Sequence, residues 1–172
     1  MNERFEFREI KQAQAAEAAE IEQICFPPNE ANSREEVMAR AKAAPELFLV
    51  AIDKETGRMA GFLNGIATNE AKFRDEFFTD ASLHDPAGKN VMLLGLDILP
   101  EYRGQGLARE LVSHYCEREI NRGRARLILT CHAEKIPMYE KFGFRDLGLS
   151  GSVWGSVPWH EMKIKLNLPK SP

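Results

Sequence analysis

The chain of 172 residues has little cysteine, no long apolar run and little excess charge. Its three cysteines are widely spaced and include no CxxC pair. Such an odd set argues against a disulfide framework or a zinc site and suits three buried free thiols in a reducing compartment. The longest apolar stretch covers residues 91–100 and contains Asp97, whereas a membrane-spanning helix needs about 20 residues. We therefore expect no metal site and no membrane partner.

The charge balance excludes a further class of protein. Lys and Arg number 23 against 26 Asp and Glu, so the formal net charge is −3. A mildly acidic chain lacks the basic field of a dedicated nucleic-acid binder, and we expect no nucleic-acid partner. Residues 1–7 alternate charged and apolar side chains, without the apolar core that follows the basic head of a signal peptide. The expected location is the cytoplasm.

The composition is that of one folded domain. Hydrophobic residues make up 44% of the chain and charged residues 28%, ordinary values for a globular protein, and the length fits one domain. No repeat, low-complexity tract or dividing linker occurs. We expect residues 1–168 to form a single domain and residues 169–172 a frayed tail.

Hydrophobic periodicity and stop signals predict strands and helices in mixed order. The expected strands cover residues 5–10, 47–52, 59–67, 91–99 and 126–131, with two more after residue 144, the last over 161–166. The expected helices cover residues 12–25, 33–45, 106–121 and 136–142, with a weaker candidate at 73–78. Helices interposed between strands imply an α/β chain of mixed α and β elements, with one central sheet and helices on its faces.

Residues 96–108 form the most informative segment. An apolar strand ends at Pro100, and a turn with Gly104 and Gly106 leads directly into a helix. Glycines at such a turn let backbone N–H groups point into one concavity, and the helix start adds unpaired donors and the positive end of its dipole. This arrangement binds phosphate, and Arg103 and Arg109 can neutralise charge nearby.

Two familiar phosphate loops do not fit this segment. A dinucleotide fingerprint would need Gly or Ala where Arg109 stands, and a P-loop would need a GK[ST] sequence that is absent. The remaining pattern, [QR]xxGx[GA], is met by Arg103-Gly104-Gln105-Gly106-Leu107-Ala108. It is similar to the pyrophosphate loop of the GNAT acetyltransferase superfamily, and residues 96–102 and 137–144 resemble that superfamily's fourth strand and last helix.

A narrower resemblance is to the arylalkylamine (serotonin-type) N-acetyltransferases, over about residues 5–166. It is carried by short matches at residues 44–47, 130–131, 137–144, 155–157 and 161–162. The resemblance implies the GNAT fold: a mixed, mostly antiparallel sheet of about seven strands, splayed between the fourth and fifth and flanked by helices. It also implies acetyl-CoA as cosubstrate, with its pantetheine arm in that gap.

The resemblance assigns cofactor contacts residue by residue. Backbone groups of the fourth strand would pair with pantetheine: Leu96, Asp97 and Ile98. The loop and helix start would hold the pyrophosphate: Arg103, Gly104, Gln105, Gly106, Leu107, Ala108 and Arg109. His132 follows the fifth strand, where many members place an asparagine that contacts pantetheine, so the cofactor-binding set includes His132.

The implied reaction moves an acetyl group from acetyl-CoA to a small primary amine, with an arylalkylamine as one option. The amine attacks the thioester directly in a ternary complex, so the enzyme must orient both substrates, remove a proton from the ammonium and protonate the departing thiolate. Tyr139 matches the family's tyrosine near the sulfur and is the expected catalytic residue, since a phenol can protonate a thiolate. Helical spacing alone would instead make Tyr139 an aromatic core anchor beside Phe142.

The identity of the base stays open. The family's two histidines on the fourth strand correspond to Met92 and Leu94, which cannot move protons. His132, Glu134, His160 or bulk water are the candidate replacements. Two other residues are weaker candidates for the chemistry: Asp97, whose side chain should face away from those of its neighbours, and Cys131, which lacks an obvious His/Asp partner pattern.

Other functions compete with catalysis. The missing histidines favour a GNAT-like module that binds CoA without turnover, as a sensor or partner protein. Arg122, Arg124 and Arg126 could contact RNA, a protein N-terminus or the ribose 3′-phosphate of CoA, although the same run is typical of a solvated strand edge and helix C-terminus.

The Phe26-Pro27-Pro28 corner and a second aromatic set (Phe73, Phe77 and Phe78) could wall the amine site or fill the core. We expect a monomer or homodimer.

Overall fold

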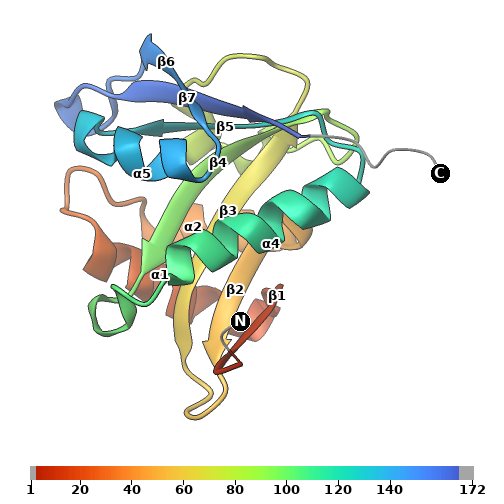
Figure 1. Ribbon diagram of the computed structural model, residues 1–172, viewed down its shortest axis with the longest axis vertical. Coiled ribbons are helices and arrows are strands. Elements are labelled where there is room, and N and C mark those ends of the chain that lie inside the picture. Colours follow the sequence, from red (N-terminus) through yellow and green to blue (C-terminus); the bar gives the residue numbers. More distant parts are fainter. Residues whose placement is uncertain (1–2, 167–172) are drawn as a thin grey trace.

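A computed structural model describes residues 3–166, and its centre is one seven-stranded sheet (Figure 1). The strands are β1 (Phe5–Glu9), β2 (Phe48–Asp53), β3 (Met59–Thr68), β4 (Asn90–Ile98), β5 (Arg126–Cys131), β6 (Arg145–Leu149) and β7 (His160–Lys165). They lie in the order β1-β2-β3-β4-β5-β7-β6, and all neighbours are antiparallel except β4 and β5. The predicted mixed, mostly antiparallel sheet is confirmed.

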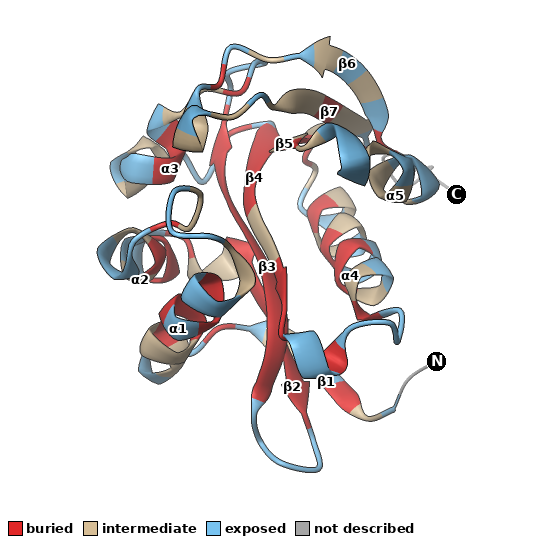
Figure 2. Ribbon diagram, turned by 90° about the vertical axis from the view of Figure 1, so that its left-hand side faces the viewer, coloured by how far each residue is buried: buried red, intermediate tan, exposed pale blue. Residues whose placement is uncertain are grey.

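The helices cover both faces of this sheet (Figure 2). One face carries α1 (Ala15–Cys25), α2 (Arg34–Ala43) and the short α3 (Glu76–Thr79), and the other carries α4 (Leu107–Asn121) and α5 (Ile136–Lys141). Helix α2 begins as its sequence predicts, because Ser33 and Glu36 form a reciprocal capping box. The weaker helix expected at residues 73–78 is shorter and lies later, as α3.

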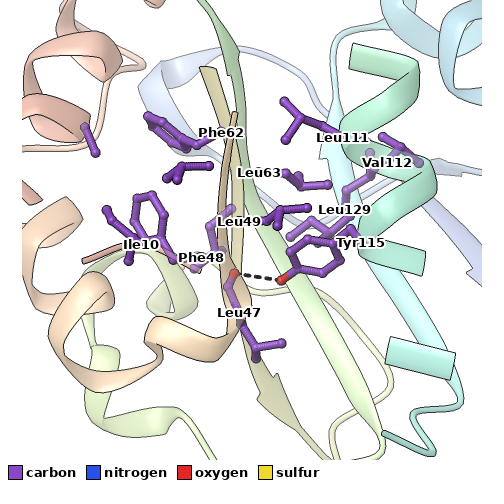
Figure 3. Packing of buried hydrophobic residues seen from close by; sticks show 14 of the residues in the cluster. Ile10, Leu47, Phe48, Leu49, Phe62, Leu63, Leu111, Val112, Tyr115 and Leu129 are labelled. Atoms are coloured by element: carbon purple, nitrogen blue, oxygen red, sulfur yellow. Dashed lines mark hydrogen bonds between the residues drawn. The ribbon is translucent and has the colours of Figure 1, made fainter. Parts of the chain in front are cut away.

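The core has one layer on each face of the sheet (Figure 3). Successive side chains of a strand point to opposite faces, so the aromatic rings of β2 and β3 lie on the α1–α2 side while the neighbouring leucines lie against α4 (Figure 3). Tyr115 of α4 is buried in the second layer, and its hydroxyl donates to the Leu47 carbonyl at 2.9 Å. Both β2 and β3 are buried along their whole lengths, which accounts for their nearly continuous apolar sequences.

Strands β4 and β5 pair over only part of their length. The parallel ladder joins Asn90–Met92 to Arg126–Ile128 and stops there, although β4 continues to Ile98. The ladder between β3 and β4 shifts where Asn64 pairs with Gly95 and Gly65 with Leu93, which leaves Leu94 as a β-bulge. The expected splay between the fourth and fifth strands is therefore present, and it opens beside a bulge that the sequence pattern did not predict.

The structure also bears on the cysteines, on membrane-spanning helices and on the limits of the domain. The cysteines are free, but only Cys131 is buried, while Cys25 and Cys116 are half-buried, so the expectation of three buried thiols was wrong for two of them. Within residues 3–166, no helix is both long and apolar enough to cross a bilayer. The tail expected at 169–172 and the domain end at 168 lie outside the described residues.

Candidate active site

A cavity of about 730 Å³ lies at the gap between β4 and β5, and residues from both faces of the sheet line it. The gap itself contributes residues of β4 (Leu93, Leu94, Gly95, Leu96 and Ile98) and of β5 (Leu129, Thr130 and Cys131). On the α4–α5 face the lining includes Gly104, Gly106, Leu107, Ala108, Arg109, Met138 and Tyr139. On the α1–α2 face it includes Glu22, Phe26, Pro27, Glu30, Asn32, Phe78 and Trp154. The cavity thus borders elements on both faces of the sheet.

The glycine turn before α4 has the open geometry that a phosphate cradle needs. Gly104 and Gly106 have φ values of +76° and +80°, a left-handed conformation in which other residues are strained. A Cβ at either position would meet no atom of the described residues within 4 Å, so the backbone is approachable. With the N–H groups at the start of α4, this loop can bind an anion. Gln105, the predicted contact between the glycines, is exposed and is not part of the cavity lining.

Arg103 lies in the cavity wall and is tied to β4. Its Nε donates to the Ile98 carbonyl at 2.9 Å, and the Cys25 thiol donates to the same oxygen at 3.3 Å. The Ile98 carbonyl therefore already has two protein donors, and the Arg103 charge is held at the base of the gap. Leu96 and Ile98 both line the cavity, and the cofactor contacts assigned to the fourth strand and the loop stay predictions.

Asp97 points to the opposite face from Leu96, as the alternation predicts. Its carboxyl group is fully buried on the α1–α2 side, near Glu22 and Arg40. Burial and the negative charge of the neighbouring Glu22 raise the pKa of Asp97 well above its usual value. Sequence reasoning missed Glu22, although a charged residue on the stripe that also carries Ala15, Ala18 and Ala19 was a visible signal.

Tyr139 projects from α5 into the cavity wall. Its ring makes edge-to-face contacts with Phe142 and Phe144, at centroid distances of 6.1 and 5.6 Å. Burial, with the nearby Cys131 and Asp97, strongly raises the pKa of the Tyr139 hydroxyl, so the group stays protonated and can donate. The ring packing that the helical spacing indicated is present, and the role of Tyr139 as proton donor stays a prediction.

Among the candidate bases, His132 contacts both a carboxylate and an aromatic ring. Its Nε2 lies 2.6 Å from Glu30 Oε1, and its ring stacks on Trp159 at 4.3 Å between centroids. Glu134 also lines the main cavity. His160 lies outside that lining and its Nδ1 is 3.2 Å from Asp146 Oδ1.

The two positions that replace the family histidines differ in placement. Met92 is fully buried, whereas Leu94, the bulged residue, lines the cavity. Cys131 also lines the cavity, and burial raises the pKa of its thiol to about 11. A neutral thiol is a poor nucleophile near neutral pH, which agrees with the weak case for a covalent role.

Aromatic side chains form part of the cavity wall on the α1–α2 face. Phe78 packs on Trp154 at 4.6 Å between ring centroids, and Trp154 Nε1 donates to the Glu30 carbonyl at 2.7 Å. Trp159 Nε1 donates in turn to the Trp154 carbonyl at 2.7 Å. Of the aromatic groups that the sequence left between wall and core, Phe26 and Phe78 line the cavity, while Phe73 and Phe77 are buried and do not. The two tryptophans are additional lining that sequence reasoning missed.

The arginine run forms the solvated edge that the pattern indicated only in part, since Arg122 is exposed and Arg126 is half-buried. Arg124 is buried, and its Nε donates to Glu119 Oε1 at 3.0 Å. Arg122 donates to the Glu46 carbonyl at 2.8 Å and also contacts Glu119, and Arg126 reaches Asn90. These contacts stabilise the far end of α4. Since Arg124 is not available at the surface, a three-arginine face for RNA or phosphate is wrong.

Comparisons with known proteins identify the family. The model of the Acetyltransferase (GNAT) family matches residues 15–144. Serotonin N-acetyltransferase of Mesocricetus auratus is 29% identical over 113 residues, which are 65% of this chain and 53% of that protein. The chain matches about half or less of the length of such curated relatives.

Solved structures share the fold at low sequence identity. The loading GNATL domain of CurA from Lyngbya majuscula superposes with a TM-score of 0.81 at 14% identity, covering 94% of this chain and 98% of that one. The protein yncA of Salmonella typhimurium, solved with its cofactor acetyl-CoA, has a TM-score of 0.66 at 17% identity, covering 98% of this chain and 97% of that one. The family resemblance and the fold expected from it are confirmed, and the chain belongs to the Acetyltransferase (GNAT) family.

Proposed function

We propose that this protein transfers an acetyl group from acetyl-CoA to a small primary amine, with arylalkylamines as the preferred class. The observation that carries the proposal is the single cavity at the gap between β4 and β5, with an amide-rich loop on one sheet face and an acidic, aromatic chamber on the other. Two substrates that enter from opposite faces meet there, which is the geometry a direct transfer requires.

The α4 side is suited to the cofactor. The open backbone at Gly104 and Gly106 and the first turn of α4 supply N–H donors for the pyrophosphate, and Arg109 adds a positive charge at the cavity wall. Leu96 lies where the pantetheine arm would run along β4. When bound, acetyl-CoA supplies the activated acyl group.

The α1–α2 side is suited to a cationic aromatic amine. Phe26, Phe78 and Trp154 offer apolar and aromatic surface, and we assign His132 as the base. Its Nε2 is beside Glu30 Oε1, and because a carboxylate can only accept, the neutral ring then carries its basic lone pair on Nδ1. This pairing on the acceptor side supports a base role for His132 over the cofactor contact that the resemblance implied.

The proton balance needs two protein groups. His132 removes a proton from the ammonium, which frees the nitrogen lone pair for attack on the acyl carbon. Tyr139 donates its hydroxyl proton to the departing thiolate, so that the sulfur leaves as a thiol. The raised pKa means that the Tyr139 hydroxyl is protonated before the transfer begins, as a proton donor must be.

A thiol-release assay with acetyl-CoA tests the proposal. We expect turnover with 2-phenylethylamine and tryptamine that exceeds turnover with polyamines, aminoglycosides and peptide N-termini. Thermal stabilisation by CoA without thiol release across this panel would refute catalysis and favour a CoA-binding module, the alternative suggested by Met92 and Leu94 at the histidine positions. Absence of both would refute cofactor binding as well.

A further inference from the structure

The acceptor side of the cavity contains buried polar atoms that lack a partner among residues 3–166. Glu22 and Asn32 both line the cavity and are only 1% and 2% exposed. Glu22 Oε1 and Asn32 Oδ1 accept no hydrogen bond from any described residue. Buried acceptors without donors are costly and uncommon in folded proteins. Two of them in one cavity wall therefore point to a ligand that brings N–H or O–H groups.

The Glu22 side chain and the Asn32 backbone are held in place by contacts that leave these oxygens free. The Asn32 N–H donates to Glu22 Oε2 at 2.9 Å, and the Asn32 carbonyl accepts from Gln23 Nε2 at 2.6 Å. The loop after α1 is thereby fastened back onto the helix. These contacts use the other carboxylate oxygen and the backbone of Asn32. Both residues are therefore fixed in position before a ligand binds.

The two charged residues next to Glu22, Arg40 and Asp97, leave Glu22 as the anionic group of the site. Arg40 is buried nearby, but its guanidinium donates to Asn64 Oδ1 and to the Phe78 carbonyl, each at 3.1 Å, and no ion pair within the described chain joins it to a carboxylate. The raised pKa of Asp97 keeps that carboxyl protonated, so it adds no second negative charge beside Glu22.

Gly95 leaves space beside the Glu22 carboxylate. A Cβ at this position would lie 3.4 Å from Glu22 Oε1 and 3.0 Å from Asp97 Oδ1. A side chain at this position would press against both carboxyl groups. The absence of a side chain at the bulge thus leaves space beside Glu22, at the gap between β4 and β5.

We propose that Glu22 Oε1 and Asn32 Oδ1 together bind the ammonium group of the acceptor amine, an inference that rests on the proposed function. A primary ammonium has three N–H donors and one positive charge, which match two acceptor oxygens, one of them anionic. The aromatic wall then receives the rest of the acceptor, and the nitrogen is held before His132 removes its proton. Glu22 and Asn32 are the residues that make the site selective for a cation.

Binding of charged and neutral probes tests this assignment without requiring turnover. Calorimetric titration compares 2-phenylethylamine with 2-phenylethanol, which has the same ring and chain but no charge. We expect the wild-type protein to prefer the amine by about 10-fold or more, the range for a charge-assisted hydrogen bond. Glu22→Gln and Asn32→Ala should each reduce this preference at least severalfold, with acetyl-CoA affinity unchanged. Glu20→Gln, at an exposed site on the same helix, is the matched control and should keep the preference.

The outcomes separate this inference from the proposed function. Equal wild-type affinity for the amine and the alcohol would overturn the ammonium site and would indicate that a neutral occupant such as water satisfies these atoms. Unchanged selectivity in both variants would also overturn it. Asn32→Ala carries the test by itself where Glu22→Gln does not fold. Thiol release is measured separately, so selective amine binding without turnover would support the ammonium site and count against the proposed transferase activity alone.

Discussion

The Tyr139 hydroxyl is placed so that its loss should affect chemistry more than folding. The ring packs against Phe142 and Phe144, and phenylalanine would preserve those contacts. We predict that Tyr139→Phe lowers kcat about 100-fold or more, the scale of a lost general acid, and leaves the KM for acetyl-CoA within about twofold. Thiol release under saturating substrates measures the effect. An unchanged kcat would remove Tyr139 from the mechanism.

The pair formed by Glu30 and His132 makes a different prediction, because Glu30 is a positioning residue. With the Glu30 carboxylate 2.6 Å from Nε2, the imidazole is held in one tautomer. Glu30→Gln can accept through its oxygen but supplies no charge, so we expect kcat to fall at least about 10-fold while acetyl-CoA affinity stays constant. The pH profile of kcat should shift as well, which a purely structural role would not produce.

Glu134→Gln is the comparison for that experiment, since Glu134 also lines the cavity and is a rival base. It should retain near wild-type kcat. A large loss in Glu134→Gln, together with none in Glu30→Gln, would reassign the base from His132 to Glu134.

At the scale of elements, α4 has two separable tasks: its first turn faces the cavity and its middle packs on the sheet. Gly106 precedes the helix at φ +80°, so Gly106→Ala introduces left-handed strain of about 1–2 kcal/mol. We predict that the dissociation constant for acetyl-CoA rises about 10-fold as the loop shifts. Gly57→Ala is the control, because Gly57 has φ +75° in the turn between β2 and β3 and lies outside the cavity lining. Equal losses of affinity in both variants would contradict a specific role for the loop.

The middle of α4 contributes stability through Tyr115. Its hydroxyl donates to the Leu47 carbonyl in a buried environment, and Tyr115→Phe leaves that carbonyl without the donor. We predict a decrease of about 1 kcal/mol in the free energy of unfolding by urea, with kcat unchanged in the folded protein. This is the reverse of the expectation for Tyr139→Phe. Loss of activity without loss of stability in Tyr115→Phe would show that α4 does not separate the two tasks.

The elements predicted correctly from the sequence are those whose start is marked by residues of the same segment. The capping box at Ser33 fixes the start of α2, and the glycines at 104 and 106 mark the turn into α4. The bulge at Leu94 has no such signal: an extra residue in one strand becomes visible only when the pairing with β3 is known. The same holds for the short α3, whose place depends on packing of its aromatic residues rather than on helix propensity.

At the scale of the whole molecule, the acceptor site is assembled from segments far apart in the chain. Glu30 and His132 are separated by 102 residues and meet in one pair, and Trp154 folds back onto the loop that carries Glu30. A pattern in the sequence can place each residue on an element, yet it cannot show which elements meet. This explains why the loop before α4 was predictable and the site formed by Glu22 and Asn32 was not.

The buried carboxyl group of Asp97, between the sheet and α1, makes the stability of the whole protein depend on pH. Its pKa is well above the usual value in the folded chain, while in the unfolded chain it returns to about 3.9. The folded state therefore binds more protons than the unfolded state between these two values, and stability falls as pH rises through that window. Asparagine has the shape of the protonated carboxyl group but no proton to lose. We predict that Asp97→Asn gains stability relative to the wild type as the pH is raised from 5 to 8.

Urea unfolding at several pH values measures this difference, and Asp85→Asn, in an exposed loop, controls for removal of a carboxylate. The relevant quantity is the gap in the free energy of unfolding between Asp97→Asn and the wild type, because other groups that titrate in both proteins cancel from it. A gap that widens with pH means that folding itself holds the Asp97 proton. A constant gap would contradict this, since Asp97 would then ionise alike in the folded and unfolded chains and would place a second negative charge beside Glu22. The same titration therefore bears on stability and on the charge that the acceptor amine meets.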